Sequence, residues 1–241
     1  MNFGLICATF KEAEVIVKDR QIQFTQEIQG YYFCKVEFER FNIIIAISNI
    51  GPENAVKCCS ILVKYFSIDC IMNFGTCGAI NPDIEKGSLI LPNRLVFIGN
   101  SNQEIGHTRL ANRAQQTLQF ICSISTCEEN PRGTIVSESI LASSTVFVTS
   151  NIKQSMVGLG IAAVDMESFA LAVTCNQNND MPIAIIKVVV DTLEANIYNI
   201  ENYLIEESKT LNFYGEFPRE IVWRYLNLYT DKYCDEKCNE I

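Results

Sequence analysis

We predict a single α/β domain from three observations. Strand-like and helix-like segments alternate along the 241 residues, which is typical of a layered α/β architecture. The segment Pro182–Val190 is almost wholly apolar, as expected for a strand that is buried on both faces. No repeat, low-complexity tract or linker divides the chain. We therefore expect one domain over residues 1–232, followed by a polar and flexible tail over residues 233–241.

Apolar patterning and turn residues place the individual elements. The predicted strands are Phe3–Cys7, Tyr31–Glu39, Asn42–Ser48, Asp69–Phe74, Ser88–Ile98, Gly133–Ser137 and Pro182–Val190. The predicted helices are Lys11–Lys18, a segment from Gly51 to about Phe66, Thr108–Ser123, Met166–Asn176, Asn199–Asn212 and Pro218–Tyr229. Pro52 suits the first turn of its helix, because the N–H that proline lacks would have no partner there.

The composition excludes several classes of partner. A formal net charge of -9 argues against binding a nucleic-acid backbone, which needs clustered Lys and Arg. No apolar run reaches the roughly 20 residues that a membrane-spanning helix requires. The first residues lack the basic leader of a signal peptide. We expect a cytoplasmic protein with no membrane partner.

The eleven cysteines are expected to be reduced core residues rather than a disulfide framework, because the chain is neither short nor loop-rich. Those that fall in apolar segments are Cys7, Cys58, Cys59, Cys70, Cys77 and Cys175. Cys234 and Cys238 could bind a metal ion. However, no second pair of ligands accompanies them, so we expect neither a metal site nor a cofactor.

Polar residues follow the ends of four predicted strands. Glu12 comes after the first strand, Ile50-Gly51 after Asn42–Ser48, Gly75-Thr76 after Asp69–Phe74, and Asp191 after Pro182–Val190. Ligands of open α/β sheets bind outside the carboxyl ends of the strands. The sequence therefore predicts that these four loops converge on one pocket.

Two of these positions have a structural and a functional interpretation. Gly75-Thr76-Cys77-Gly78 is expected to be a tight glycine turn, either an ordinary strand-to-loop turn or one that presents N–H groups and a hydroxyl to a ligand. Asp191 at the edge of an apolar strand would be partly desolvated, which favours its neutral, proton-donating form. It could equally be a helix cap.

Two glutamates have similar alternatives. Glu167 and Met166 lie at the start of a predicted helix, where an acidic residue could simply complement the helix dipole. Glu167 could instead accept hydrogen bonds from the hydroxyls of a sugar, with Met166 against the sugar face. Glu12 could be an ordinary solvated carboxylate, and Glu14 competes with it for any functional role.

In this order, the pieces resemble the nucleoside phosphorylase/nucleosidase family, and most closely the methylthioadenosine/S-adenosylhomocysteine nucleosidases. The matching stretches include Gly4-Leu5-Ile6-Cys7-Ala8, Ser48-Asn49-Ile50-Gly51-Pro52, Asn73-Phe74-Gly75-Thr76-Cys77-Gly78, Lys86-Gly87-Ser88-Leu89-Ile90, Gly133-Thr134-Ile135-Val136-Ser137, Val164-Asp165-Met166-Glu167-Ser168 and Pro182–Asp191. The resemblance implies a central twisted, partly closed mixed sheet flanked by helices. It also implies a homodimer or higher oligomer that acts on a purine nucleoside.

The resemblance implies a role for each site residue. Asp191 would protonate the purine at N7, Glu12 would orient the attacking water, and Glu167 with Met166 would contact the ribose. The water or phosphate site would lie near Ile50, Gly51, Gly75 and Thr76, and the base pocket near Ala8, Leu141 and Phe147. Loss of the base leaves an oxocarbenium-like sugar, so an acid and a carboxylate that steers the nucleophile are both required.

The attacking group separates hydrolases from phosphorylases. Phosphorylases of this family hold phosphate with arginines, whereas this chain has Asn73 before the glycine turn and no arginine in its first loop, Ala8–Glu14. We therefore expect hydrolysis that releases adenine from a nucleoside resembling 5′-methylthioadenosine or S-adenosylhomocysteine. A phosphate-dependent purine nucleoside phosphorylase and a non-catalytic nucleoside-binding relative remain alternatives.

The sequence departs from the family pattern at several points. Val190 replaces the usual serine before the acid, and Ile140-Leu141 stand where an aromatic residue is expected, unless Phe147 takes that role. The segment Gly99–His107 is shorter than its counterpart. His107, the only histidine, is expected at the surface; the alternative is that it lines a pocket, either its own or that of a neighbouring subunit.

Overall fold

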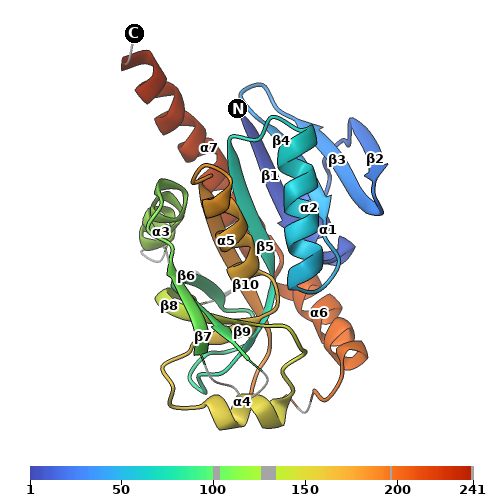
Figure 1. Cartoon of the computed structure of the whole chain (residues 1–241), viewed down its shortest axis with the longest axis vertical. Coiled ribbons are helices and arrows are strands. Elements are labelled where there is room, and N and C mark those ends of the chain that lie inside the picture. Colours follow the sequence, from blue (N-terminus) through green and yellow to red (C-terminus); the bar gives the residue numbers. More distant parts are fainter. Residues whose placement is uncertain (100–103, 126–133, 196, 240–241) are drawn as a thin grey trace.

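The structure is a computed structural model that describes residues 1–99, 104–125, 134–195 and 197–239 (Figure 1). Its centre is a mixed sheet, part of which closes on itself. The strands of the closed part are, in order around the ring, β5 (Cys70–Ala79), β10 (Ile183–Asp191), β6 (Leu89–Ile98), β8 (Ile135–Ser144) and β9 (Ala163–Asp165), which returns to β5. The predicted partly closed mixed sheet is therefore confirmed.

The rest of the sheet extends from β5 as an open wing. The wing strands are β1 (Asn2–Cys7), β4 (Asn42–Ile47), β3 (Tyr31–Glu37) and β2 (Phe24–Ile28), and β7 (Glu104–Arg109) adds to the edge of β6. Strands β4, β1, β5 and β10 run parallel to one another. Their carboxyl ends therefore meet at one edge of the sheet, which is where ligands bind in folds of this kind.

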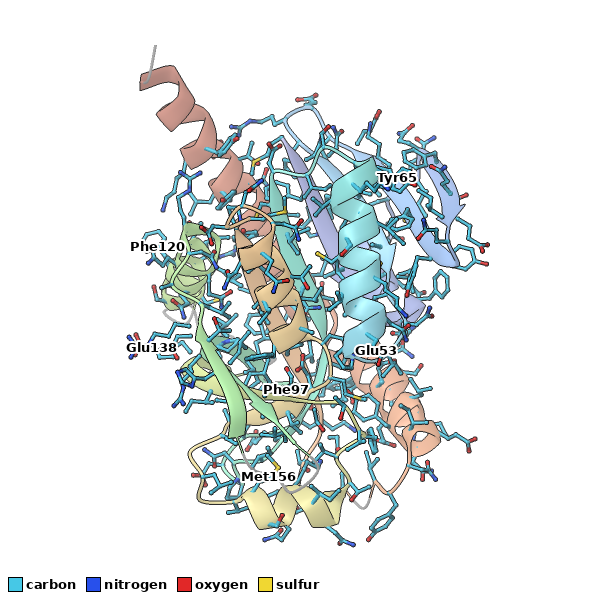
Figure 2. The ribbon with its side chains drawn as sticks, viewed as in Figure 1. Glu53, Tyr65, Phe97, Phe120, Glu138 and Met156 are labelled. Atoms are coloured by element: carbon cyan, nitrogen blue, oxygen red, sulfur yellow. The ribbon has the colours of Figure 1, made fainter. Side chains whose placement is uncertain are left out.

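Helices cover both faces of the sheet. Helices α2 (Pro52–Tyr65) and α5 (Ser168–Gln177) lie together on one face (Figure 1). The other face is packed by α1 (Phe10–Val17), α3 (Arg113–Ser125), α6 (Ile200–Tyr214) and α7 (Glu216–Asn239). The short helix α4 (Ser150–Met156) covers the end of the ring, and its Met156 is fully buried against the strands (Figure 2). No helix in the described ranges is long and apolar enough to cross a bilayer.

The central strands are apolar throughout because both of their faces are buried. In β1, Phe3 and Leu5 belong to the core beneath α1, α3, α6 and α7, whereas Ile6 belongs to the core beneath α2 and α5. Strand β4 alternates in the same way, with Ile43 on the first face and Ile44 on the second. The six cysteines predicted to be core residues are buried free thiols.

Several predicted elements differ from the structure. Gly75 and Gly78 do not form a turn but lie inside β5, which is fully buried along its length. Strand β8 continues to Ser144, well beyond the predicted end at Ser137. Strands β2, β7 and β9 and helix α4 were not expected, because each is short or has an exposed, polar pattern. Helix α7 crosses the proposed boundary at residue 232 as one continuous helix, and the mobility of the tail stays a prediction.

Candidate active site

Glu12 is buried at the edge where the parallel strands end, with only 3% of its surface exposed. It lies in the first turn of α1 and forms a reciprocal capping box with Thr9. One carboxylate oxygen, Oε2, accepts hydrogen bonds from the backbone N–H groups of Ala8 (2.7 Å) and Thr9 (3.2 Å). The other, Oε1, accepts from the N–H and the hydroxyl of Thr76 in β5, at 2.8 and 2.9 Å. Three backbone donors therefore stabilise the ionised form of this carboxyl.

The absence of a side chain at Gly75 makes room for Glu12. A Cβ atom at this position would lie 2.9 Å from Oε1 of Glu12 and 3.0 Å from Nζ of Lys187. The glycine is thus needed for close approach, and not for the turn that the sequence suggested. It brings the side chains of Glu12 from α1 and Lys187 from β10 to the same point on β5.

Lys187 is a buried cation that faces a group of carboxylates. Its Nζ lies 2.9 Å from Oδ2 of Asp165 and 3.8 Å from Oε2 of Glu167. Burial lowers the pKa of Lys187, but Asp165, Glu167 and Glu12 together outweigh burial and hold it above its usual value. Lys187 is therefore charged, and it compensates part of the negative charge at this edge.

Glu167 is directed into the site and does not cap its helix. It occupies the N-cap position of α5, yet its side chain makes no capping hydrogen bond, and the nearby Asp165 accepts from the N–H of Ser168 instead. Oε1 of Glu167 accepts a hydrogen bond from the N–H of Gly51 at 2.8 Å. Gly51 adopts φ +105°, a conformation that glycine tolerates and that turns its N–H toward Glu167. Burial raises the pKa of Glu167 to about 7, although Lys187 opposes the shift.

Asp191 is also buried and forms an ion pair with Lys153 of α4, a residue that the sequence did not suggest. The strand register shifts between Val189 and Asp191, so the extra residue Val190 forms an irregularity that re-aims the aspartate. A Cβ atom on Gly78 would lie 3.2 Å from Oδ2 of Asp191 and 3.2 Å from Nζ of Lys153. A second glycine of β5 thus provides space for this pair.

The two groups of this pair shift toward their neutral forms. Burial raises the pKa of Asp191, and Lys153 opposes the shift. Burial lowers the pKa of Lys153, and Asp191 opposes that shift in turn. Oδ2 of Asp191 contacts Lys153, whereas Oδ1 is buried and has no hydrogen-bond partner among the described residues. Oδ1 is consequently the oxygen that is available to a ligand.

Helix α6 contributes two further residues that the sequence did not suggest. Glu207 is 2% exposed, and its Oε1 lies 2.9 Å from the hydroxyl oxygen of Thr76. The hydroxyl of Tyr203 donates to the same Thr76 oxygen at 2.8 Å. The ring of Tyr203 also packs edge-on against Phe147, with ring centroids 5.4 Å apart. Tyr203 therefore links the predicted water site to the aromatic residue proposed for the base pocket.

A pocket of about 510 Å³ opens beside these groups. Its walls include Ala8, Ile50 and Glu207, which come from the loop after β1, the loop after β4 and helix α6. Phe147 is half-buried, whereas Leu141 is fully buried in the core beneath α2 and α5. Of the two base-pocket candidates on this segment, Phe147 is thus the more accessible. Met166 is half-buried beside Glu167.

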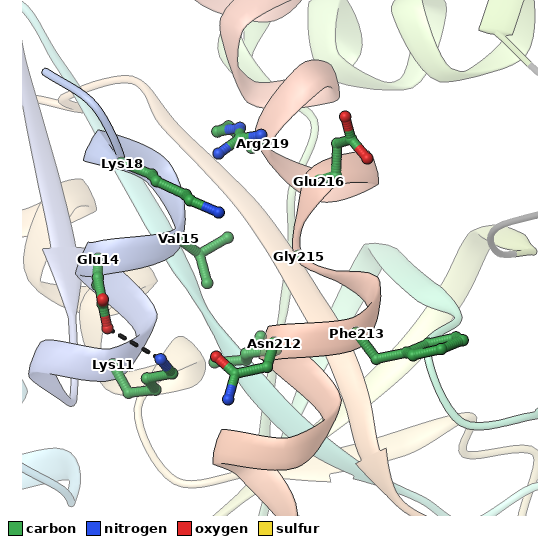
Figure 3. Close-up of a pocket in the computed structure, with 10 residues that line it drawn as sticks. Lys11, Glu14, Val15, Lys18, Asn212, Phe213, Gly215, Glu216 and Arg219 are labelled. Carbon is green, nitrogen blue, oxygen red and sulfur yellow. Dashed lines mark hydrogen bonds and ion pairs between the residues drawn. The ribbon is translucent and has the colours of Figure 1, made fainter.

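A second pocket lies between α1 and the junction of α6 and α7 (Figure 3). Its volume is about 260 Å³, and its lining includes Lys18 and Arg219. Glu14 also lines this pocket and pairs with Lys11 at 2.9 Å. The side chain of Glu14 is 65% exposed, so Glu14 does not compete with Glu12 for the buried site.

Comparison with known proteins places this arrangement in a family. The model of the phosphorylase superfamily matches residues 2–226, which is most of the chain. The chain belongs to the phosphorylase superfamily. Among curated proteins, it is 22% identical over 211 residues to a 5′-methylthioadenosine/S-adenosylhomocysteine nucleosidase of Buchnera aphidicola subsp. Baizongia pistaciae. That alignment covers 85% of this chain and 83% of the relative.

Solved structures share the fold of this chain. The futalosine hydrolase of Helicobacter pylori, solved as a mutant, superimposes with a TM-score of 0.75 at 17% identity, covering 93% of this chain and 99% of that one. An aspartate-to-asparagine mutant of a nucleosidase from the same organism was solved with 5′-methylthioadenosine in its active site. It also gives a TM-score of 0.75, at 17% identity, and the match covers 92% of this chain and 98% of that one.

Some signals for this superfamily member's site were present in the sequence. Thr9 and Glu12 have the spacing of a capping box, which would have placed Glu12 in an ordered first turn. Lys187 interrupts an otherwise apolar strand, a pattern that indicates a paired buried charge. His107 lies on β7 and is exposed. The side chains of Cys234 and Cys238 lie outside the described residues.

Proposed function

We propose that the protein is a purine nucleosidase that hydrolyses the N-glycosidic bond of a 5′-thio-substituted adenosine and releases adenine. One observation carries the choice of water as the nucleophile. Thr76, at the proposed nucleophile site, is flanked by two carboxyl groups, Glu12 and Glu207, at 2.9 Å each. At this position a phosphate dianion would be repelled by the Glu12 carboxylate, whereas neutral water can donate a hydrogen bond to it. The names of the curated relatives support the same reaction.

The site supplies a donor and an acceptor for each proton. Asp191 delivers its proton to N7 of the purine through Oδ1, the bond between the sugar and N9 breaks, and its electron pair leaves with the base. Water then forms a bond to C1′ of the oxocarbenium-like sugar and transfers its proton to the Glu12 carboxylate. Solvent exchange returns a proton to Asp191 and removes one from Glu12. Glu167 accepts hydrogen bonds from the ribose hydroxyls, and Met166 lies against the sugar face.

The substrate class follows from the walls of the pocket. Ile50 and Leu204 give the 510 Å³ pocket an apolar side, which suits a thioether substituent at the 5′ position. Phe147 offers an aromatic face for the purine. Ala8 also lines the same pocket.

The decisive experiment is a panel of nucleosides assayed with and without inorganic phosphate, with the free base and the sugar product as readouts. We expect adenine and a free 5-thio-sugar from methylthioadenosine, at a rate that phosphate does not change. Formation of a sugar 1-phosphate would replace this proposal with a phosphorylase. Binding without turnover of any nucleoside would indicate a non-catalytic relative.

We also propose that the protein is a cytoplasmic homodimer. An apolar groove of about 590 Å³ supports the dimer, since its lining includes Phe10 and Tyr32, which are 62% and 49% exposed. The free thiols of the described cysteines suit a reducing compartment. Light scattering on the purified protein would give twice the chain mass, and a monomer at all concentrations would contradict the dimer. Cell fractionation tests the location.

A further inference from the structure

Glu207 stands apart from the other buried carboxyl groups of the site. Among the described residues, no lysine or arginine forms an ion pair with Glu207, whereas Asp165, Glu167 and Asp191 each face a lysine. Its neighbours are instead the hydroxyl groups of Thr76 and Thr9 and the carboxyl group of Glu12. A buried carboxylate with neither a cation nor an N–H donor would be costly. The arrangement therefore raises the question of how its charge is removed.

The number of hydrogens available around the Thr76 hydroxyl indicates that one carboxyl group is neutral. The Thr76 hydroxyl oxygen makes three contacts, to Oε1 of Glu12 (2.9 Å), Oε1 of Glu207 (2.9 Å) and the hydroxyl of Tyr203 (2.8 Å). Three hydrogen bonds need three hydrogens, and the hydroxyls of Thr76 and Tyr203 supply one each. The third hydrogen must come from a carboxyl group. One of the two glutamates is thus protonated.

The surrounding donors identify which glutamate holds the proton. Glu12 accepts three backbone hydrogen bonds, from the N–H groups of Ala8, Thr9 and Thr76, and each favours its ionised form. Within the described part of the chain, Glu207 accepts no hydrogen bond from the backbone. Its Oε2 lies 3.3 Å from the hydroxyl of Thr9, which suits the carbonyl oxygen of a neutral acid. Its Oε1 is then the protonated oxygen that donates to Thr76.

We propose that Glu12 and Glu207 form a carboxyl pair that shares one proton across the Thr76 hydroxyl, and that Glu207 holds this proton so that Glu12 stays ionised to receive the proton of water. Glu207 is a positioning residue, since it acts on water through Thr76 and Glu12. This role rests on the proposed function and names a residue that determines when the site is active. Burial, reinforced by Glu12, raises the pKa of Glu207 to about 8, in agreement with the hydrogen count.

The titration of Glu207 depends on the charged groups around it. Glu12 and Lys11 approach from α1, Tyr203 from α6 itself, and Lys187 reaches the far side of Glu12 from β10. From α7, Glu216 and Arg219 line the separate pocket of Figure 3.

When Glu207 ionises, two carboxylates compete for the single Thr76 hydrogen and repel each other. The geometry around Glu12 is then lost, and turnover should fall as the pH rises through about 8.

Infrared titration of the whole protein tests the pair without relying on activity. With 13C-labelled glutamate, the carbonyl band of protonated carboxyls should decrease in two steps, one near pH 7 for Glu167 and one near pH 8 for Glu207. Glu207→Gln should remove only the later step. Glu201→Gln, which changes an exposed carboxyl of the same helix, should keep both steps. Persistence of the later step in Glu207→Gln would overturn the proposal.

Kinetics then test the positioning role. Glu207→Ala should lower kcat about tenfold, the size of one lost hydrogen bond, with a smaller change in KM. Glu207→Gln retains a neutral donor to Thr76, so it should rescue most of this loss and abolish the decline above pH 8. An unchanged alkaline decline in Glu207→Gln would refute the role. If the wild-type protein cleaved no nucleoside, the proposed function would fail, while the infrared steps would still decide whether the pair exists.

Discussion

Asp191 and Glu207 are both buried carboxyl groups of one site, yet the protein stabilises them in different ways. Asp191 faces Lys153, a buried cation from a separate helix, whereas Glu207 faces two threonine hydroxyls and the Glu12 carboxyl. A lysine offsets the negative charge of a neighbouring carboxylate. A hydroxyl between two carboxyl groups carries no charge, so it can only hydrogen-bond to both and let them share a proton. The comparison indicates that one site can set the protonation of its carboxyl groups in two ways. A lysine does so beside the proton donor Asp191, and a shared hydrogen does so beside Glu12, which activates water.

The strongest test of the lysine-paired end is Asp191→Asn. We expect kcat to fall about 10²- to 10⁴-fold, because the amide cannot protonate the leaving base. The circular dichroism spectrum and the melting temperature should show an intact fold. Asp83→Asn, a change at an exposed loop carboxyl, is the matched control and should retain activity. Full activity of Asp191→Asn would refute the assignment of the acid.

A variant without the Lys153 cation tests how strongly this lysine stabilises the buried Asp191. Lys153→Met leaves Asp191 buried without its partner, which should cost about 3–5 kcal/mol of unfolding free energy when the aspartate is ionised. Without the lysine the folded-state pKa of Asp191 rises further above its unfolded value, so the stability of the variant should decrease as the pH rises.

Urea denaturation at several pH values measures this effect. The double variant Lys153→Met with Asp191→Asn should recover much of the loss, because no buried charge is then left alone. A single variant that is equally destabilised at every pH would mean that Lys153 acts through packing and not through charge.

At the hydroxyl-linked end, Glu207→Gln should change how stability depends on pH. The pKa of Glu207 is raised in the folded state, so the contribution of Glu207 to wild-type stability is fully present below the unfolded value of 4.5 and is lost as the pH rises to about 8. Glutamine removes this loss, at up to about 1.4 kcal/mol per pH unit within that window. The stability of the variant relative to the wild type should therefore increase from pH 4.5 to about 8 and then level off. A difference in stability between Glu207→Gln and the wild type that does not change with pH would contradict this prediction.

The smallest expected effect comes from the two glycines of β5. A Cβ atom at Gly75 would lie 2.9 Å from Glu12 Oε1, whereas one at Gly78 would lie 3.2 Å from its nearest neighbours. We expect Gly75→Ala to cost about 1–3 kcal/mol, the usual range for overpacking, and Gly78→Ala to cost less. Thermal denaturation of both variants gives the comparison, and a larger loss for Gly78→Ala would reverse the order of crowding.

The fold could be predicted from the sequence because it depends on local patterns. Pro182–Val190 is apolar on both faces, and the carboxyl end of that strand located Asp191 correctly at the sheet edge. Glu12 and Glu167 could be chosen only from the order of motifs along the chain. Whether their carboxyls are buried depends on residues distant in sequence, such as Thr76 and Gly51.

Two residues that adjoin the site carboxyls, Lys153 and Glu207, could not be predicted. Lys153 lies in a short helix that has no strong apolar pattern, and Glu207 lies in a helix with many other polar residues. Nothing in such a pattern tells which polar side chain is turned inward, because tertiary packing decides it. The interpretation of Gly75 was wrong for a related reason. A glycine needed for close approach has the same sequence signature as one needed for a turn.

The buried thiols of the core give the protein a set of internal reporters. Burial raises the pKa of Cys58 in α2 and of Cys70 in β5 to about 12 each, and that of Cys7 in β1 well above its usual value. Alkylating reagents attack the thiolate, so each sulfur should react only when its own element opens. The rate of modification at each cysteine would thus measure how often a given strand or helix next to the active site separates from the core, without the introduction of any label.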